Sequence, residues 1–335
     1  MRIGIAGAGL LGRLLAWRLA RAGHQVTVAD PAPGPEPGTE RAAAFSAAGL
    51  LSPIAELECS NPQLAARGWR SLQLWPRWLE ELPLPVPFQA QGSLLLAHPV
   101  DRASAQRLLT RLAALGQRLP DALNAAELQA LEPALQSGLL GWRLEGEGCI
   151  HPLRALQALF EAGRTCGVQW QWGRRVQQLA PGRLDDAAFD EVIDVRGLGA
   201  RPELPLRGVR GEIFWLHAPG LTLQRPLRLL HPRARVYLVP REAAQIVVGA
   251  TEIESEDRGP VSLRSTLELL GAAQSVLPAL SEARLLHSET NLRPALAGNL
   301  PLLRREAGLT RINGLYRHGW LLAPALIEEA WPLWN

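Results

Sequence analysis

The first thirty residues of the chain show two hydrophobic periods in immediate succession. Residues 2–6 form a short apolar run with β-branched side chains, the length of a buried strand. Apolar residues then recur at helical spacing from Leu11 to Leu19, and Gly23 ends the predicted helix. A second apolar run at residues 25–29 predicts another strand. The pattern therefore predicts a βαβ unit.

Three glycines join the first strand to the helix in the spacing Gly-x-Gly-x-x-Gly. Gly7 allows a tight turn, Gly9 lets the backbone approach a pyrophosphate, and Gly12 lets the helix pack closely on the strand. The free N–H groups of the helix N-terminus attract phosphate. Asp30 follows the second strand, where a carboxylate would bind the ribose hydroxyls of adenosine. An ordinary buried βαβ unit is the alternative, but this context favours a dinucleotide site.

The remaining periodicities predict further helices and strands. Helices are expected at residues 62–82, 101–115, 153–164 and 263–276, with a short capped helix after Asn124 and a last helix opened by Pro324. Strands are expected at residues 88–97, 168–172, 191–195, 211–217, 236–239, 245–250, 284–290 and 309–313. Pro76 is expected to kink or break its helix, and residues 141–148 to form turns. The small residues 42–51 predict either a helix or a segment that passes close to a large group.

This order of elements predicts two domains. Residues 1–85, 145–205 and 291–335 would form a discontinuous nucleotide-binding domain around the βαβ unit. Residues 86–144 and 206–290 would form a second domain, whose successive strands imply an antiparallel or mixed sheet. Ligands should bind between the two.

Composition narrows the class of protein. Hydrophobic residues make up 47% and charged residues 20%, as in an ordinary globular enzyme. The net charge is +3 without a dense basic tract, so we expect no nucleic-acid partner. The distant Cys59, Cys149 and Cys166 suggest reduced thiols, and we expect no metal site. We interpret residues 1–11 as a strand and not a signal peptide, expect no membrane span, and expect the protein to be cytoplasmic.

Several segments, taken together, resemble one family. They are Gly7 to Gly12 with Asp30, residues 46–50, residues 195–200, residues 237–241 with 247–251, the Asn-Leu-Arg-Pro of residues 291–294, and residues 314–324. The chain resembles the FAD-dependent D-amino-acid-oxidase superfamily, and it is most similar to the glycine oxidases of thiamine biosynthesis. The resemblance implies an α/β fold: a Rossmann-like FAD-binding domain with an inserted antiparallel or mixed-sheet (α+β) substrate domain.

The resemblance also implies FAD as the cofactor and assigns residues to it. Asp30 would replace the family's usual glutamate at the ribose, residues 48–50 would run beside the isoalloxazine, and Val176 would contact the adenine end. Residues 315–321 would wrap the pyrimidine edge of the flavin. The expected FAD-binding residues are Gly7, Gly9, Leu10, Leu11, Gly12, Asp30, Ala48, Gly49, Leu50, Val176, Gly197, Leu315, Tyr316, His318, Gly319, Trp320 and Leu321.

Three residues are candidates for substrate binding. The guanidinium fork of Arg293 matches a planar carboxylate, although a surface arginine paired with an acid is the alternative. The hydroxyl of Tyr237 could donate to the same carboxylate or to a backbone carbonyl. Arg317 could hold the substrate or the flavin edge. We expect His318 to be a turn residue and not a catalytic base.

These features predict oxidative deamination of glycine or a small amino acid or amine. The neutral amine would lose a hydride from its α-carbon to the flavin and become an imine, and dioxygen would become hydrogen peroxide. The imine would hydrolyse or pass to thiazole synthase. Two alternatives stay open: a D-amino-acid dehydrogenase that reduces a quinone, and a flavoprotein partner with little turnover, whose Trp-rich residues 69–78 would form an interface.

Overall fold

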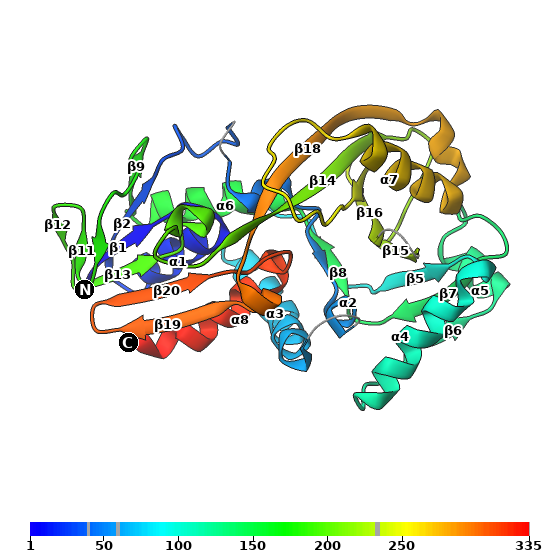
Figure 1. Cartoon of the computed structure of the whole chain (residues 1–335), viewed down its shortest axis with the longest axis horizontal. Helices are drawn as coiled ribbons and strands as arrows, with labels where there is room; N and C mark the ends of the chain where they lie inside the picture. Colours follow the sequence, from blue (N-terminus) through cyan, green and yellow to red (C-terminus); the bar gives the residue numbers. More distant parts are fainter. Residues whose placement is uncertain (39–40, 58–60, 232–234, 335) are drawn as a thin grey trace.

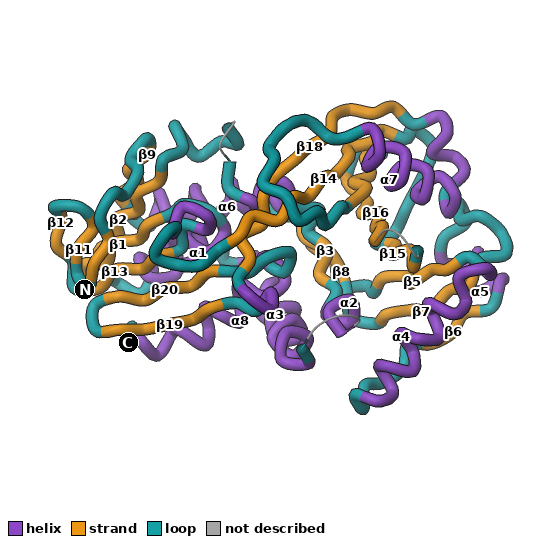
Figure 2. Tube along the Cα trace, viewed as in Figure 1, coloured by secondary structure: helices purple, strands orange, loops and turns teal. Residues whose placement is uncertain are grey.

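The computed structural model describes residues 1–38, 41–57, 61–231 and 235–334. Within these residues the strands form a six-stranded sheet, an eight-stranded sheet and two three-stranded sheets. The two large sheets lie toward opposite ends of the elongated molecule (Figure 1). The long strands β14 (Arg207–His217) and β18 (Arg284–Ala295) belong to the eight-stranded sheet and extend toward the middle of the molecule. Loop segments gather beside these two strands (Figure 2). The mixed α/β class is as predicted.

The six-stranded sheet contains the predicted βαβ unit. Its spatial order is β19 (Leu302–Glu306), β20 (Leu309–Asn313), β13 (Glu191–Asp194), β1 (Arg2–Ala6), β2 (Gln25–Asp30) and β9 (Gln169–Trp172). All neighbours are parallel except β19 and β20. The helix α1 (Leu10–Arg21) joins β1 to β2 and packs on α6 (Pro152–Thr165). Ile3 and Ile5 are fully buried, as expected for a parallel strand covered on both faces.

The eight-stranded sheet has the order β18, β14, β17 (Gln245–Gly249), β16 (Arg235–Arg241), β15 (Leu227–Leu230), β5 (Ser93–Ala97), β7 (Leu140–Leu144) and β6 (Asp121–Leu123). Only β15 and β5 are parallel neighbours among these described strands. The helix α7 (Leu263–Val276) packs its buried face on β16 and β17. The helices α4 (Arg102–Ala114) and α5 (Ala125–Leu131) complete this part, and the predicted capping box at Asn124 is present.

Besides the last helix, the described residues also contain two small sheets and two further α-helices. One sheet joins β3 (Leu50–Leu51), β8 (Gly148–Ile150) and β4 (Phe88–Gln89), and the other joins β10 (Leu179–Ala180), β11 (Arg183–Leu184) and β12 (Ala187–Ala188). The short α2 (Pro53–Leu57) precedes α3 (Pro62–Glu80). The predicted division into domains stays a prediction, and its boundary at residue 291 falls inside β18.

The last helix begins earlier than predicted. Helix α8 (Gly319–Ala330) contains Pro324 in its interior. A proline inside a helix leaves the carbonyl four residues earlier without its usual partner. The Trp320 carbonyl instead accepts the indole N–H of Trp75 at 3.0 Å, and the Ala325 N–H donates to Ser71 Oγ at 3.1 Å. Because both partners come from the neighbouring α3, tertiary packing supplies hydrogen bonds in place of those that a proline removes within its own helix.

Three other expectations are corrected. Helix α3 continues through Pro76, because the buried Trp75 and Trp78 pack into the core on both sides of the proline. Since these two tryptophans are buried, they are not part of an exposed interface. Of residues 141–148, the first four belong to β7 and the last begins β8, so the predicted turn is confined to residues 145–146. Gly148 is required by close packing, since a Cβ atom there would lie 1.8 Å from the Gln89 carbonyl oxygen.

Segments whose hydrophobic pattern is weak or mixed also differ from the predicted secondary structure. Residues 42–51 are not an α-helix: they form a short 3₁₀ turn at Ala43–Ser46 and then β3. Strands β15 and β19 are absent from the predicted elements. Strand β18 extends beyond residue 290, so Arg293 and Pro294 lie within a strand and not after it. The proline is tolerated because β18 is the edge of its sheet.

Two expectations from composition, on the cysteines and on membrane spans, can be compared with the structure. Cys149 and Cys166 are free thiols, whereas Cys59 lies outside the described residues. Across the described part of the chain, the helices are all too short or too polar to cross a membrane.

Candidate functional site

The glycine turn between β1 and α1 forms a narrow backbone cradle. Gly7 has a φ of +106°, and a Cβ atom at Gly12 would lie 1.8 Å from the Gly7 carbonyl oxygen. Only glycines therefore allow the helix to start this close to the strand. Gly9 precedes the first helical residue, and the N–H groups of the first turn have no partners within the helix. This end of α1 opens into a cavity lined by Gly7, Gly9, Leu10 and Leu11.

Asp30 stands at the end of β2 beside this cradle. Its Oδ2 accepts the Ala8 N–H at 2.6 Å, and its Oδ1 accepts the Ala32 N–H at 2.8 Å. Each carboxylate oxygen keeps a second lone pair for a further donor. Asp30 also lines the cavity. The carboxylate thus holds the turn in shape and presents acceptors to the cavity.

Arg13 is part of this wall and is missing from the predicted site. Its side chain is buried, and it donates to the carbonyls of Ala8 at 2.9 Å, Leu156 at 2.8 Å and Pro35 at 2.6 Å. Burial lowers its pKa to about 10, so the guanidinium remains charged near neutral pH. The guanidinium carbon lies 5.8 Å from the centre of the Trp172 ring. The one sequence feature that could have revealed it is a charged residue on the apolar side of α1.

The cavity has a volume of about 700 Å³, within the range of cofactor and ligand sites. It extends from the glycine cradle to β16 and β18 of the eight-stranded sheet. Its described lining holds ten arginines and four acids: Arg13, Arg41, Arg175, Arg196, Arg201, Arg228, Arg235, Arg258, Arg293 and Arg317, with Asp30, Glu36, Glu252 and Glu256. Such an excess of positive charge favours anionic ligands.

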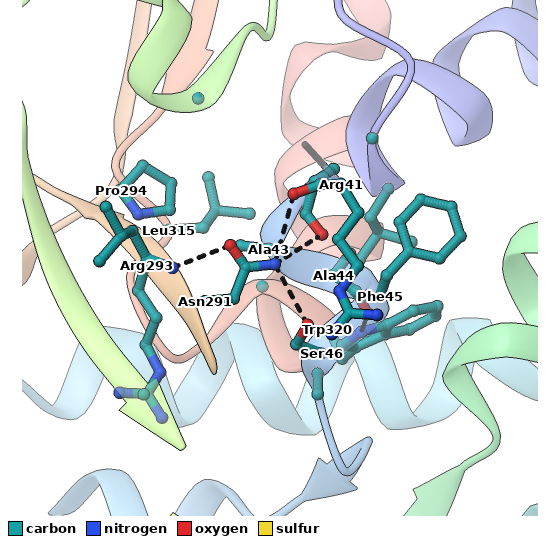
Figure 3. A pocket seen from close by; sticks show the side chains of 18 of the residues that line it. Arg41, Ala43, Ala44, Phe45, Ser46, Asn291, Arg293, Pro294, Leu315 and Trp320 are labelled. Carbon is teal, nitrogen blue, oxygen red and sulfur yellow. Dashed lines mark hydrogen bonds between the residues drawn. The ribbon is translucent and has the colours of Figure 1, made fainter. Parts of the chain in front are cut away.

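The middle of the cavity is formed by residues 41–50. Asn291 of β18 donates to the carbonyls of Arg41 at 3.3 Å and Ala42 at 3.4 Å and to Ser46 Oγ at 3.1 Å. Figure 3 shows Asn291 facing this segment, while the side chain of Arg293 extends away from it. A Cβ atom at Gly49 would lie 2.1 Å from the Ile150 carbonyl oxygen, so glycine lets residues 48–50 approach β8. Residues 41–50, β8 and β18 are thereby held together along one wall of the cavity.

At the far end, two glycines make room for the candidate substrate residues. Gly211 leaves space for Arg293, since a Cβ atom there would lie 2.4 Å from the Arg293 Cζ. Gly249 does the same for Tyr237, its neighbour across the sheet, with 2.6 Å to the tyrosine hydroxyl. The Nη1 of Arg293 donates to the Thr251 carbonyl at 2.8 Å. The guanidinium and the phenol therefore lie over the sheet in the same cavity.

Burial, together with the nearby charge of Glu252, keeps the two site tyrosines protonated. Burial raises the pKa of Tyr237 to about 12; Glu252 adds to this, and the positive charge of Arg293 opposes it. Burial and Glu252 likewise raise the pKa of Tyr316 to about 12. Both hydroxyls are therefore neutral potential donors at physiological pH.

Arg317 is held by an acid that the sequence analysis does not include. Its Nη1 donates to Glu252 Oε1 at 2.5 Å, and Arg235 Nη1 lies 3.2 Å from both oxygens of the same carboxylate. His318 is buried and precedes α8, whose first residues line the cavity. The N-terminus of α8 thus adds a partial positive charge to this end of the site.

The structure brings the predicted site residues together with two exceptions. Gly12 acts through the packing of α1 and does not line the cavity. Val176 is buried in a small apolar cluster with Ala29 and Leu184, away from the described lining, and its contact with adenine stays a prediction. The predicted site residues that line the cavity are Gly7, Gly9, Leu10, Leu11, Asp30, Ala48, Gly49, Leu50, Gly197, Tyr237, Arg293, Leu315, Tyr316, Arg317, His318, Gly319, Trp320 and Leu321.

Comparisons with known proteins agree with this geometry. The family model of the FAD dependent oxidoreductases (DAO) matches residues 2–330. A protein of Rhizobium etli named as thiamine biosynthesis oxidoreductase ThiO is 37% identical over 334 residues, which cover 98% of this chain and 95% of that protein. The bifunctional protein ThiO/ThiG of Trichormus variabilis is 27% identical over 97% of this chain, which spans about half (52%) of that longer protein.

A solved structure shows the same fold. The crystal structure of glycine oxidase from Geobacillus kaustophilus has a TM-score of 0.82 and 26% sequence identity. The match covers 98% of this chain and 93% of that one. The likeness therefore extends over nearly the whole chain and includes the residues of both large sheets.

Proposed function

This chain belongs to the family of FAD-dependent oxidoreductases, and from that membership we propose that it oxidises glycine or a small amino acid or amine to an imine. The observation that carries the proposal is the position of Arg293 and Tyr237 over Gly211 and Gly249, in the cavity that begins at the dinucleotide cradle. A carboxylate bound there would place the rest of a small substrate inside the same cavity.

The residues present fit FAD. The cradle of Gly7, Gly9 and Gly12 leaves backbone N–H groups for the pyrophosphate, and Asp30 presents acceptors for ribose hydroxyls. Residues 48–50 and the start of α8 line the continuation of the cavity, where they would hold the ring system. When bound, FAD would supply the acceptor for the hydride of the substrate's α-carbon.

The protein's own contribution is mainly orientation. Arg293 would bind the substrate carboxylate through its fork, and the neutral Tyr237 would donate a hydrogen bond to it. Glu252 and Glu256, two acids of the lining, are engaged with arginines. We therefore propose that the substrate reacts as the neutral amine, without a dedicated carboxylate base.

This proposal predicts a rate that rises with pH. Amino groups of free amino acids are mostly protonated at pH 7, so anaerobic flavin reduction should become about tenfold faster per pH unit until the bound amine is neutral. The two tyrosines, with pKa values of about 12, should not add an ionisation below pH 10. Stopped-flow reduction by glycine from pH 6 to 10 measures this. A flat profile would contradict the requirement for a neutral amine.

Gly211→Ala should displace Arg293 while leaving the fold and the cofactor in place. The added methyl group would overlap the flexible end of the arginine, which moves more easily than backbone. We expect carboxylate ligands to bind about ten- to a hundredfold more weakly, the loss of one charge-assisted interaction of about 1.5–3 kcal/mol. A glycolate titration of flavin absorbance measures the change. Gly271→Ala in α7, where a Cβ atom meets nothing within 4 Å, is the control and should bind glycolate normally.

The pathway and the electron acceptor are further parts of the proposal. The relatives named for thiamine biosynthesis, one of them fused to ThiG, support delivery of the imine to a thiazole synthase.

Dioxygen is the proposed acceptor of the flavin's electrons, and a quinone is the alternative. Mixing the glycine-reduced protein with oxygen or with a soluble quinone distinguishes the two. If glycine and other small amines fail to bleach the flavin without oxygen, the proposed reaction is wrong. The cytoplasmic location stays a prediction.

A further inference from the structure

Glu252 lies at the substrate end of the cavity between two arginines. It follows β17 and lines the cavity together with Arg235 and Arg317. Its carboxylate accepts from Arg317 Nη1 at 2.5 Å and from Arg235 Nη1 at 3.2 Å. Side-chain exposure is 27% for Glu252 and 15% for Arg317, so the pair is only partly screened by solvent.

Backbone contacts fix this acid next to Arg293. The Arg293 guanidinium donates to the carbonyl of Thr251, the residue before Glu252. On the other side, the Tyr316 N–H donates to the Pro294 carbonyl at 2.9 Å, which places Arg317 next to the same strand. Ile253, the residue after Glu252, exchanges two backbone hydrogen bonds with Arg210 of β14, at 2.9 and 3.0 Å. Three separate segments therefore converge on one group of charges.

The charge balance of this group determines which ligands it accepts. Arg293, Arg235 and Arg317 carry three positive charges, and Glu252 carries the one negative charge among these four. A ligand with one carboxylate needs only Arg293. A ligand with a second carboxylate would find Arg235 and Arg317 already engaged, and it would meet the like charge of Glu252.

We infer that Glu252 restricts the site to substrates with a single carboxylate by occupying Arg235 and Arg317. This inference rests on the proposed function, since it assigns the first carboxylate to Arg293. Glu252 is a specificity-determining residue and takes no part in the oxidation itself. Glycine and neutral small amino acids satisfy the restriction, whereas iminodiacetate and acidic amino acids do not.

Glu252→Gln tests the inference by removing the charge while keeping the shape. We expect the FAD-bound variant to bind malonate at least about tenfold more tightly than the wild type, and glycolate within about twofold. Flavin absorbance titrations give both dissociation constants. The ratio of kcat/KM for iminodiacetate to that for glycine should rise by a similar factor, and the gain should shrink at high salt. Glu252→Met, which removes the charge by a different side chain, should shift the ratios in the same direction.

Glu254→Gln is the matched control. Glu254 lies two positions away and also pairs with an arginine, at 3.0 Å from Arg207 Nε, but it is exposed and outside the cavity lining. This variant should leave the malonate-to-glycolate ratio at the wild-type value. An unchanged ratio in both Glu252 variants, with glycolate binding intact, would overturn the inference and leave the proposed function standing. If the wild type binds neither glycine nor glycolate, the proposed function fails and the inference fails with it.

Discussion

Replacing Arg293 with alanine should abolish tight binding of substrate and carboxylate inhibitors while leaving FAD bound. The charge-assisted pair with a desolvated carboxylate is worth about 2–5 kcal/mol. The cofactor should remain, because the glycine cradle and Asp30 lie at the other end of the cavity. Without a bound ligand, the variant loses only the hydrogen bond from Arg293 to the Thr251 carbonyl. We expect this loss to affect the fold much less than the substitution affects ligand binding. Titration of flavin absorbance with glycolate and glycine measures the effect.

Two further variants make the Arg293 experiment specific. Arg293→Lys should recover only part of the affinity, because an ammonium group lacks the planar fork. Arg304→Ala removes the same charge from an exposed position of β19 and should bind glycolate normally. Unchanged glycolate affinity in Arg293→Ala would remove this residue from the site, and with it the main support for oxidation of amino acids.

Gly9→Val should yield a folded protein that has lost most of its FAD. A Cβ atom at Gly9 meets the Ala42 Cβ at 3.3 Å, so the fold can adapt to it with a small shift. The two methyl groups of valine would then occupy the place where the backbone approaches the pyrophosphate. The ratio of flavin to protein absorbance after purification measures retention, and circular dichroism measures the fold.

Two neighbouring substitutions separate binding from folding. Gly9→Ala adds a single methyl group and should retain more FAD than Gly9→Val. Gly12→Ala should instead destabilise the protein itself, by about 1–3 kcal/mol or more, because its Cβ would collide with backbone at the Gly7 carbonyl. Full retention of FAD by Gly9→Val would show that the nucleotide does not lie against this turn.

The predictions that succeeded depend on contacts between residues close in the sequence. Strand β1, the glycine turn, α1 and β2 follow one another within thirty residues, and each has a hydrophobic period or a backbone requirement that sequence shows directly. The same holds for α7, whose predicted bounds agree with the structure, and for the capping box at Asn124. Arg293 and Tyr237 are different: only the family resemblance selected them among many polar residues of the strands.

The predictions that failed depend on partners far away along the chain. Pro324 ends a helix by local rules, but Trp75 and Ser71 of α3 supply the replacement hydrogen bonds. From the sequence, Gly148 is interpreted as a turn residue, whereas the structure shows that it is needed for close packing against Gln89. Local patterns contain no information about such neighbours, because a strand or helix acquires them only when the elements pack.

By itself, the sequence determined the dinucleotide cradle, since the three glycines and Asp30 act within one local unit. Only the tertiary structure decided the chemistry of the other end of the cavity. Gly211 and Gly249 are ordinary strand residues in the sequence, and they become the space for Arg293 and Tyr237 because β14, β16, β17 and β18 are neighbours in the sheet. Glu252 reaches Arg317 across 65 positions of chain for the same reason. Side-chain charge can be read from sequence, but its partner is chosen by packing.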